Sequence, residues 1–168
     1  KPSKTENADT VSSVVTCDEC NGWLNPALAV DAAVQRGDEI LLIQRKFPPM
    51  VGFWGLPGGF VERDEDPLDA VLRELEEETG IHKNQISIDP IFRFEICYPV
   101  TYTDPSPATY HKQVVYFLAF LSPKPKLKLT EHDSFRWHDW DPKVKVQEET
   151  IDPLIQAVAA HFASPGSR

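Results

Sequence analysis

The chain has 168 residues, of which 41% are hydrophobic and 26% are charged. This size and apolar content fit one globular domain with a sizeable core and exclude a wholly disordered chain. Seventeen basic and 26 acidic side chains give a net charge of −9, which disfavours a nucleic acid partner because its phosphates are also negative. We therefore expect no DNA partner and disfavour RNA.

Residues 1–22 are polar and predict a tail or cap, residues 23–163 a single domain, and residues 164–168 a second tail. No run approaches the roughly 18 apolar residues of a membrane-spanning helix, so we expect no membrane contact. The start of the chain lacks the apolar run of a signal peptide, although a targeting segment removed before Lys1 stays possible. The oligomeric state is left open between monomer and homodimer.

The three cysteines are an odd number, which favours the cytoplasm or another reducing compartment. Cys17 and Cys20 form a C-x-x-C pair. A structural zinc ion needs four ligands and the chain has no second pair, so this pair alone does not predict a zinc site.

The first elements expected after the tail are two strands. The apolar runs of residues 27–35 and 39–45 are joined across Gly37-Asp38 and predict a β-hairpin. Residues 47–60 contain three prolines and four glycines and predict a loop.

A helix is predicted between Asp66 and Gly80. Asp66 suits the N-cap, Pro67 the first helical position, and Gly80 the left-handed residue after the end. Four side chains at helical spacing predict its buried face: Leu68, Val71, Leu72 and Leu75.

The remaining elements follow the helix. We predict a strand within 85–98, a loop over 99–110, a buried strand over 112–121, a short strand over 134–140, and an amphipathic helix over 148–162 that is interrupted near Pro153.

Glu74, Glu77 and Glu78 share one face of the predicted helix, where like charges repel. One interpretation is a solvated acidic face. The other is that the carboxylates converge on divalent cations, which prefer hard oxygen ligands.

The segment from Gly59 to Ile81, GFVERDEDPLDAVLRELEEETGI, decides between these interpretations. It fits the pattern Gly, five residues, Glu, seven residues, Arg-Glu-apolar-x-Glu-Glu-x-Gly-apolar. A chance match to its seven fixed positions is on the order of one in a hundred million per window. This pattern is the Nudix box, and the chain resembles the Nudix hydrolases. The resemblance implies their α/β/α sandwich with a mixed central sheet, an α+β fold, from about Asn25 to Phe162.

The resemblance also implies roles within the box. Arg73 would orient the glutamates, and Glu65 would pair with Arg73 to fasten the loop to the helix. Glu74 and Glu77 would take part in catalysis, with one carboxylate accepting the proton of the attacking water. The implied ligands of Mg²⁺ or Mn²⁺ are the Gly59 carbonyl and the carboxylates of Glu74, Glu77 and Glu78.

Outside the box, Glu131 resembles the position from which some Nudix enzymes recruit a further ligand or the catalytic base, and a plain surface glutamate is the alternative. Arg45 and Lys46 end the second strand of the hairpin. They are candidates for phosphate contact or are simply solvated cations.

Four further residues are candidates for substrate contact. Trp54 would either stack on a base or fill the core. Tyr98, Tyr102 and His111 flank the predicted loop before the buried strand.

The substrate indications point two ways. FPPMVGFWGLPGGFVE resembles the branch that cleaves ADP-ribose, whereas FRFEICY, KQVVYFLAFL and EHDSFRW resemble the asymmetric diadenosine tetraphosphate hydrolases. We predict a metal-dependent pyrophosphohydrolase acting on a small-molecule nucleotide. The alternatives are an RNA 5′-pyrophosphohydrolase, whose basic track would have to come from lysines such as Lys124 and Lys126, and a non-catalytic nucleotide sensor.

Overall fold

The computed structural model describes residues 28–47, 51–102, 108–121, 126–130, 132–143 and 145–164, with the side chains of 100–102 and 108–110 left out. The predicted tail, the Cys17–Cys20 pair and Glu131 lie outside the described residues. The elements are β1 (Leu28–Arg36), β2 (Glu39–Arg45), β3 (Trp54–Gly55), β4 (Gly58–Phe60), α1 (Pro67–Thr79), η1 (Lys83–Gln85), β5 (Ile86–Tyr102), β6 (Ala108–Leu121), β7 (His132–Asp139) and α2 (Ile151–Ala163).

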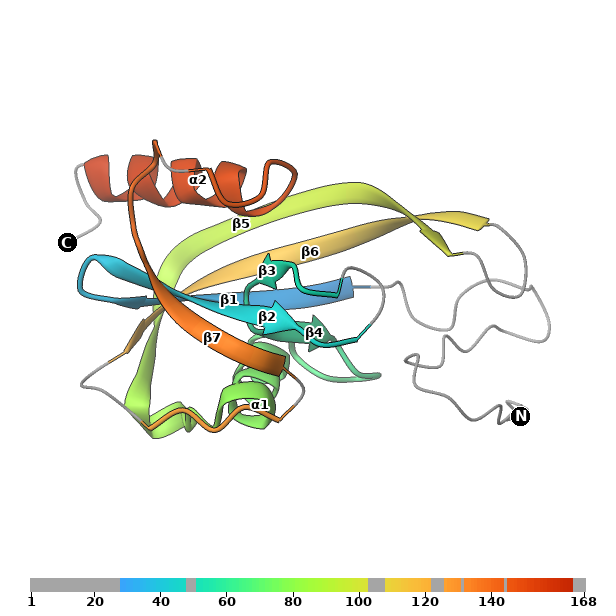
Figure 1. Cartoon of the computed structure of the whole chain (residues 1–168), viewed down its shortest axis with the longest axis horizontal. Coiled ribbons are helices and arrows are strands. Elements are labelled where there is room, and N and C mark those ends of the chain that lie inside the picture. The colour runs from blue at the N-terminus through green and yellow to red at the C-terminus, as the bar shows by residue number, and fades with distance from the viewer. Residues whose placement is uncertain are drawn as a thin grey trace.

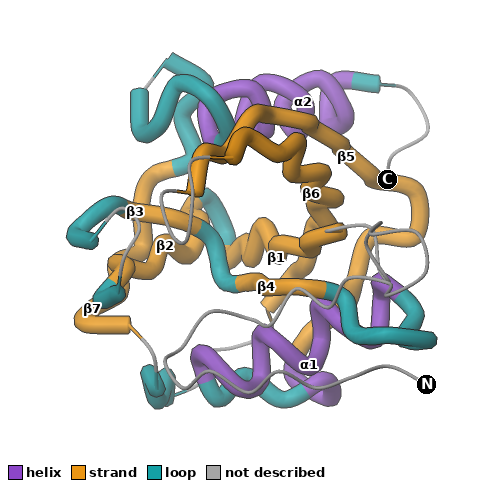
Figure 2. The backbone as a smooth tube through the Cα atoms, turned by 90° about the vertical axis from the view of Figure 1, so that its right-hand side faces the viewer, coloured by secondary structure: helices purple, strands orange, loops and turns teal. Residues whose placement is uncertain are grey.

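The described strands form one mixed sheet in the order β3-β2-β1-β6-β5, with β4 added to β1 and β7 added to β2. Strands β1 and β6 are parallel, and the other described pairs are antiparallel. Helices α1 and α2 lie on opposite sides of the sheet (Figures 1 and 2). The α/β/α sandwich is therefore confirmed. No helix in the described ranges is long and apolar enough to cross a membrane.

Alternation along the central strands divides the core in two. In β1, Ala29 and Ala33 belong to the cluster that includes α2, whereas Val30, Ala32 and Val34 belong to the cluster that includes α1. Strand β6 is buried on both faces from Val114 to Ala119, as its continuous apolar run predicts.

Helix α1 forms as predicted because its start and end signals are local. The Asp66 carboxylate accepts the Leu68 N–H at 2.8 Å, and Gly80 ends the helix with φ 72°. Val71 and Leu75 are buried against the sheet, while Leu68 and Leu72 pack at the edge of the same cluster. The predicted hairpin of β1 and β2 is also confirmed.

Four of the predicted elements differ from the structure. The loop predicted over 47–60 contains β3 and β4, which are too short to show an alternating pattern. The loop predicted over 99–110 is shorter, because β5 and β6 pair as far as Tyr102 and Ala108. Pro99 is tolerated there since β5 is the last strand in the sheet order, where a missing N–H need not break a ladder.

The third error concerns α2, which begins at Ile151 and is not interrupted. Pro153 lies in the first turn of the helix. The N–H groups of that turn have no partner within the helix, so a proline there removes no helical hydrogen bond. Strand β7 also begins two residues earlier than predicted, at His132.

Candidate active site

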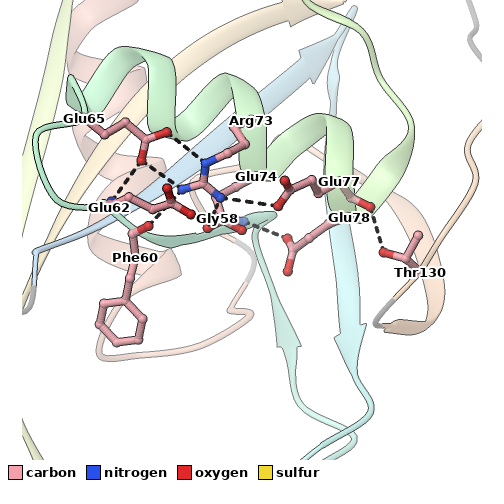
Figure 3. A network of polar contacts seen from close by, with 9 residues as sticks. All are labelled: Gly58, Phe60, Glu62, Glu65, Arg73, Glu74, Glu77, Glu78 and Thr130. Carbon is pink, nitrogen blue, oxygen red and sulfur yellow. Dashed lines mark hydrogen bonds and ion pairs between the residues drawn. The ribbon is translucent and has the colours of Figure 1, made fainter. Parts of the chain in front are cut away.

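Arg73 on α1 is the centre of a polar network (Figure 3). Its Nε and Nη2 donate to the Glu65 carboxylate at 2.8 and 2.9 Å, and Nη2 also donates to the Phe60 carbonyl at 3.1 Å. Hydrogen bonding from Arg73 lowers the pKa of Glu65, and the same bond raises the pKa of Arg73. The expected pair of Glu65 and Arg73 is thus present, and it fastens the β4–α1 loop to the helix.

The other side of the Arg73 guanidinium faces the glutamates. Its Nη1 donates to Glu74 at 2.8 Å and to Glu77 at 3.3 Å. The Glu77 side chain is 62% exposed, and that of Glu74 only 16%. One arginine therefore offsets the mutual repulsion of these carboxylates and leaves Glu77 facing solvent.

Glu78 lies deeper, with its side chain 9% exposed. One carboxylate oxygen accepts the Gly58 N–H at 2.8 Å, and the other lies 3.7 Å from His132 Nδ1. This glutamate therefore bonds α1 to β4 and lies beside the start of β7.

The two glycines of β4 allow its backbone to pass directly against neighbouring groups. A β-carbon on Gly59 would lie 2.4 Å from Cδ of Glu74, and one on Gly58 would lie 2.1 Å from the Val30 carbonyl oxygen. Only glycine fits both contacts without movement. The main chain of Gly59 and the Glu74 carboxylate are therefore held together.

Within the described residues, no three His, Cys, Asp or Glu side chains are already gathered as in a formed metal centre. Arg73 holds both Glu74 and Glu77 in this arrangement. The donors nevertheless fit a hard divalent cation, since they are carboxylates on one helix face beside a close glycine backbone.

Of the candidate substrate residues, Arg45 pairs with His132 beside this site, whereas Trp54 packs on the α2 side of the sheet. Arg45 is exposed at the end of β2, and its charge acts on Asp31 and His132. Trp54 is half-buried, and Arg136 stacks on its ring at 4.3 Å from the centroid. Trp54 also lines a surface pocket with Val51, Gly52, Phe53, Val146 and Gln147.

The other candidates are separated by the sheet. Tyr98 pairs with Lys112 and packs on the α2 side. His111 is one position earlier on β6, so its exposed side chain points to the opposite face. Tyr102 is in β5, but its side chain lies outside the described residues.

Two charged residues near the site are absent from the sequence predictions. Asp31 on β1 and Lys112 on β6 influence each other's pKa. Burial raises the pKa of Asp31 to about 6, and the charges of Lys112 and Arg45 oppose this rise. The sequence feature that could have identified Asp31 is its position as the single carboxylate inside the apolar run ALAVDAAV.

Replacing Asp31 should remove a pH dependence of stability. The folded state holds the Asp31 proton more tightly than the unfolded chain, so this stabilisation is complete below pH 3.8 and is lost as pH rises through about 6. Asp31→Asn cannot ionise. In metal-free protein its free energy of unfolding, relative to wild type, should rise by up to about 3 kcal/mol between pH 4 and 7. Urea unfolding across this range measures the effect, and a constant difference would contradict it.

Gly59→Ala should damage the site more than the fold. The new β-carbon must displace the Glu74 carboxylate, which is the mobile end of a side chain. We expect the affinity for a divalent cation to fall roughly tenfold or more, which is the usual effect of losing a contact that positions a metal ligand. The free energy of unfolding should fall by less than about 2 kcal/mol. Gly55→Ala is the matched control because its β-carbon meets nothing within 4 Å. Equal metal affinity in the two variants would contradict the expectation.

The sandwich with glutamates around one arginine is the architecture of a class of pyrophosphohydrolases. The NUDIX domain model matches residues 25–156, and the chain belongs to the Nudix hydrolase family.

Relatives within the family carry two different names. The chain is 51% identical over 59 residues to an ADP-ribose pyrophosphatase of Methanocaldococcus jannaschii, a match covering 35% of each chain. It is 31% identical over 127 residues to an asymmetrical bis(5′-nucleosyl)-tetraphosphatase of Caenorhabditis elegans, covering 74% of this chain and 86% of the relative. A crystal structure of a C. elegans Ap4A hydrolase binary complex superposes with a TM-score of 0.66 at 27% identity, covering 82% of this chain and 98% of the other.

Proposed function

We propose that this protein is a metal-dependent pyrophosphohydrolase that cleaves a nucleoside diphosphate linked to another moiety, either an ADP-ribose-like compound or a dinucleoside polyphosphate. The observation that carries the proposal is that Arg73 binds Glu74 and Glu77, while the Gly59 backbone lies against Glu74 and Glu78 is bound to Gly58. The ligands for Mg²⁺ or Mn²⁺ would be these three glutamates and the Gly59 carbonyl.

The local charge supports a cation at this place. Nine acidic and two basic residues lie between Gly59 and Ile81, a net charge of −7 that repels a diphosphate. A bound Mg²⁺ or Mn²⁺ would neutralise that charge and lower the pKa of an attacking water. Arg73 would hold Glu74 and Glu77 in position. Glu77, as the most exposed of the three carboxylates, would accept the proton of the water.

Two features support a nucleotide substrate. The pocket beside Trp54 offers an apolar and aromatic surface for a base, and Arg45 and Lys112 supply positive charge between β2 and β6 for phosphates. A relative matched over 86% of its own length is named for a dinucleoside tetraphosphate, which favours that substrate over ADP-ribose.

The test is a hydrolysis panel with Mg²⁺ and with Mn²⁺. It contains diadenosine tetraphosphate, ADP-ribose, NADH, nucleoside triphosphates, sugar nucleotides and a 5′-triphosphorylated RNA. We expect cleavage of diadenosine tetraphosphate or ADP-ribose, and complete loss of cleavage with a chelator. Preferential cleavage of the RNA, with salt-sensitive binding, would replace the proposal with the RNA alternative. Tight nucleotide binding without cleavage would replace it with the sensor alternative.

A further inference from the structure

The first residue of β7, His132, brings an unsatisfied nitrogen to the edge of the glutamate cluster. Its side chain is 10% exposed, and its buried Nδ1 has no hydrogen-bond partner. The carboxylate of Glu78 is about as buried, and His132 Nδ1 lies 3.7 Å from its Oε1. A side chain this deeply buried ordinarily has its polar atoms satisfied, so this nitrogen requires an explanation.

The distance excludes a direct hydrogen bond, which would bring nitrogen and oxygen within about 3.2 Å. It fits a shared cation. Two atoms bonded to one ion at about 2.1 Å each lie no more than about 4.2 Å apart. The pair of His132 Nδ1 and Glu78 Oε1 falls within that span.

We propose that His132 is a nitrogen ligand of the divalent cation held by Glu78, and that it biases this site toward transition-metal ions over Mg²⁺. Imidazole is a common ligand of transition metals, whereas Mg²⁺ is bound through oxygen and retained waters. The inference rests on the proposed function because it concerns the cation of the same site.

The direct test uses Mn²⁺ alone bound to metal-free wild-type protein. Pulsed electron paramagnetic resonance should detect coupling between Mn²⁺ and a nitrogen nucleus, and His132→Asn should abolish it. The absence of nitrogen coupling in the wild-type protein would overturn the inference, and this measurement does not depend on the folding of any variant.

Calorimetric titration supplies the second readout. In His132→Asn, the affinities for Mn²⁺ and Co²⁺ should fall roughly tenfold or more, and that for Mg²⁺ by less than about threefold. An equal loss for all three ions would overturn the inference, because it would mean that His132 only positions Glu78. Should His132→Asn unfold, His132→Gln replaces it in the same titrations.

His82→Asn is the matched control. His82 is exposed and pairs with Glu76 at the end of α1, so this variant should keep both the nitrogen coupling and the wild-type affinities. The His132 ligand and the proposed function can be disproved independently. A wild-type protein that cleaves nucleotides but shows no nitrogen coupling contradicts only the His132 ligand, whereas nitrogen coupling without any cleavage contradicts only the proposed function.

Discussion

Glu77→Gln is expected to lower kcat by about 100-fold or more without unfolding the protein. The amide keeps the shape of the side chain but removes the negative charge available to a cation or a proton. Losing a metal ligand or a general base costs several kcal/mol of transition-state stabilisation. Glutamine forms helices about as well as glutamate, and this side chain is 62% exposed, so stability should change by less than about 0.5 kcal/mol. Steady-state kinetics and a thermal melt of the same preparation measure both effects.

The matched control for this variant is Glu76→Gln, the same substitution one position earlier. Glu76 pairs with exposed His82 near the end of α1. It should retain turnover within about twofold, since it alters only a surface ion pair. Equal turnover in Glu77→Gln and Glu76→Gln would exclude Glu77 from the site.

Arg73→Lys is the second substitution with a large expected effect. A lysine keeps the positive charge but has no planar fork, so it cannot bond both oxygens of Glu65 and also reach the Phe60 carbonyl and Glu74. We expect the free energy of unfolding to fall by about 2 kcal/mol. The loss is not larger because Arg73 is 25% exposed and its hydrogen bonds are partly screened by solvent. Turnover should fall at least about tenfold because Glu74 and Glu77 lose their common anchor. Denaturant unfolding and kinetics measure the two losses.

A double-mutant cycle with Glu65→Gln separates these two roles of Arg73. Glu65 bonds Arg73 and the Glu62 N–H, and these bonds hold the β4–α1 loop. The coupling free energy for stability should be roughly 1–3 kcal/mol, as for directly bonded groups. Glu65→Gln alone should lose less turnover than Arg73→Lys. Additive stability losses would show that the loop is not fastened by this pair.

Local signals predicted α1 almost to the residue. The cap at Asp66, the terminal glycine at Gly80 and the spacing of Leu75 with Val71 all act within a few turns of one helix. The same holds for the face shared by the glutamates, since helical periodicity alone sets it. The strands were predicted where apolar runs are long, as in β6, and missed where strands are short and glycine-rich, as in β3 and β4.

Pairing between distant segments produced the rest of the site. Asp31 and Lys112 approach because β1 and β6 pair in parallel. Asp31 lies opposite Tyr116, and Lys112 points to the same face of β6 as Tyr116. His132 approaches Glu78 because β7 adds to the edge of β2, although 54 positions separate the two residues in the chain. Tyr98 and His111 were both predicted to flank the loop before β6. They lie on opposite sides of the sheet because neighbouring positions of a strand point to opposite faces.

By itself, the sequence determined the family, the limits of α1 and the residues whose charge defines the acidic site, because these depend on spacing within one continuous segment. Only the tertiary structure decided that Glu78 lies deep against Gly58 and that His132 faces it. These contacts depend on strand register and burial, to which residues far apart in the chain contribute and which no local pattern records.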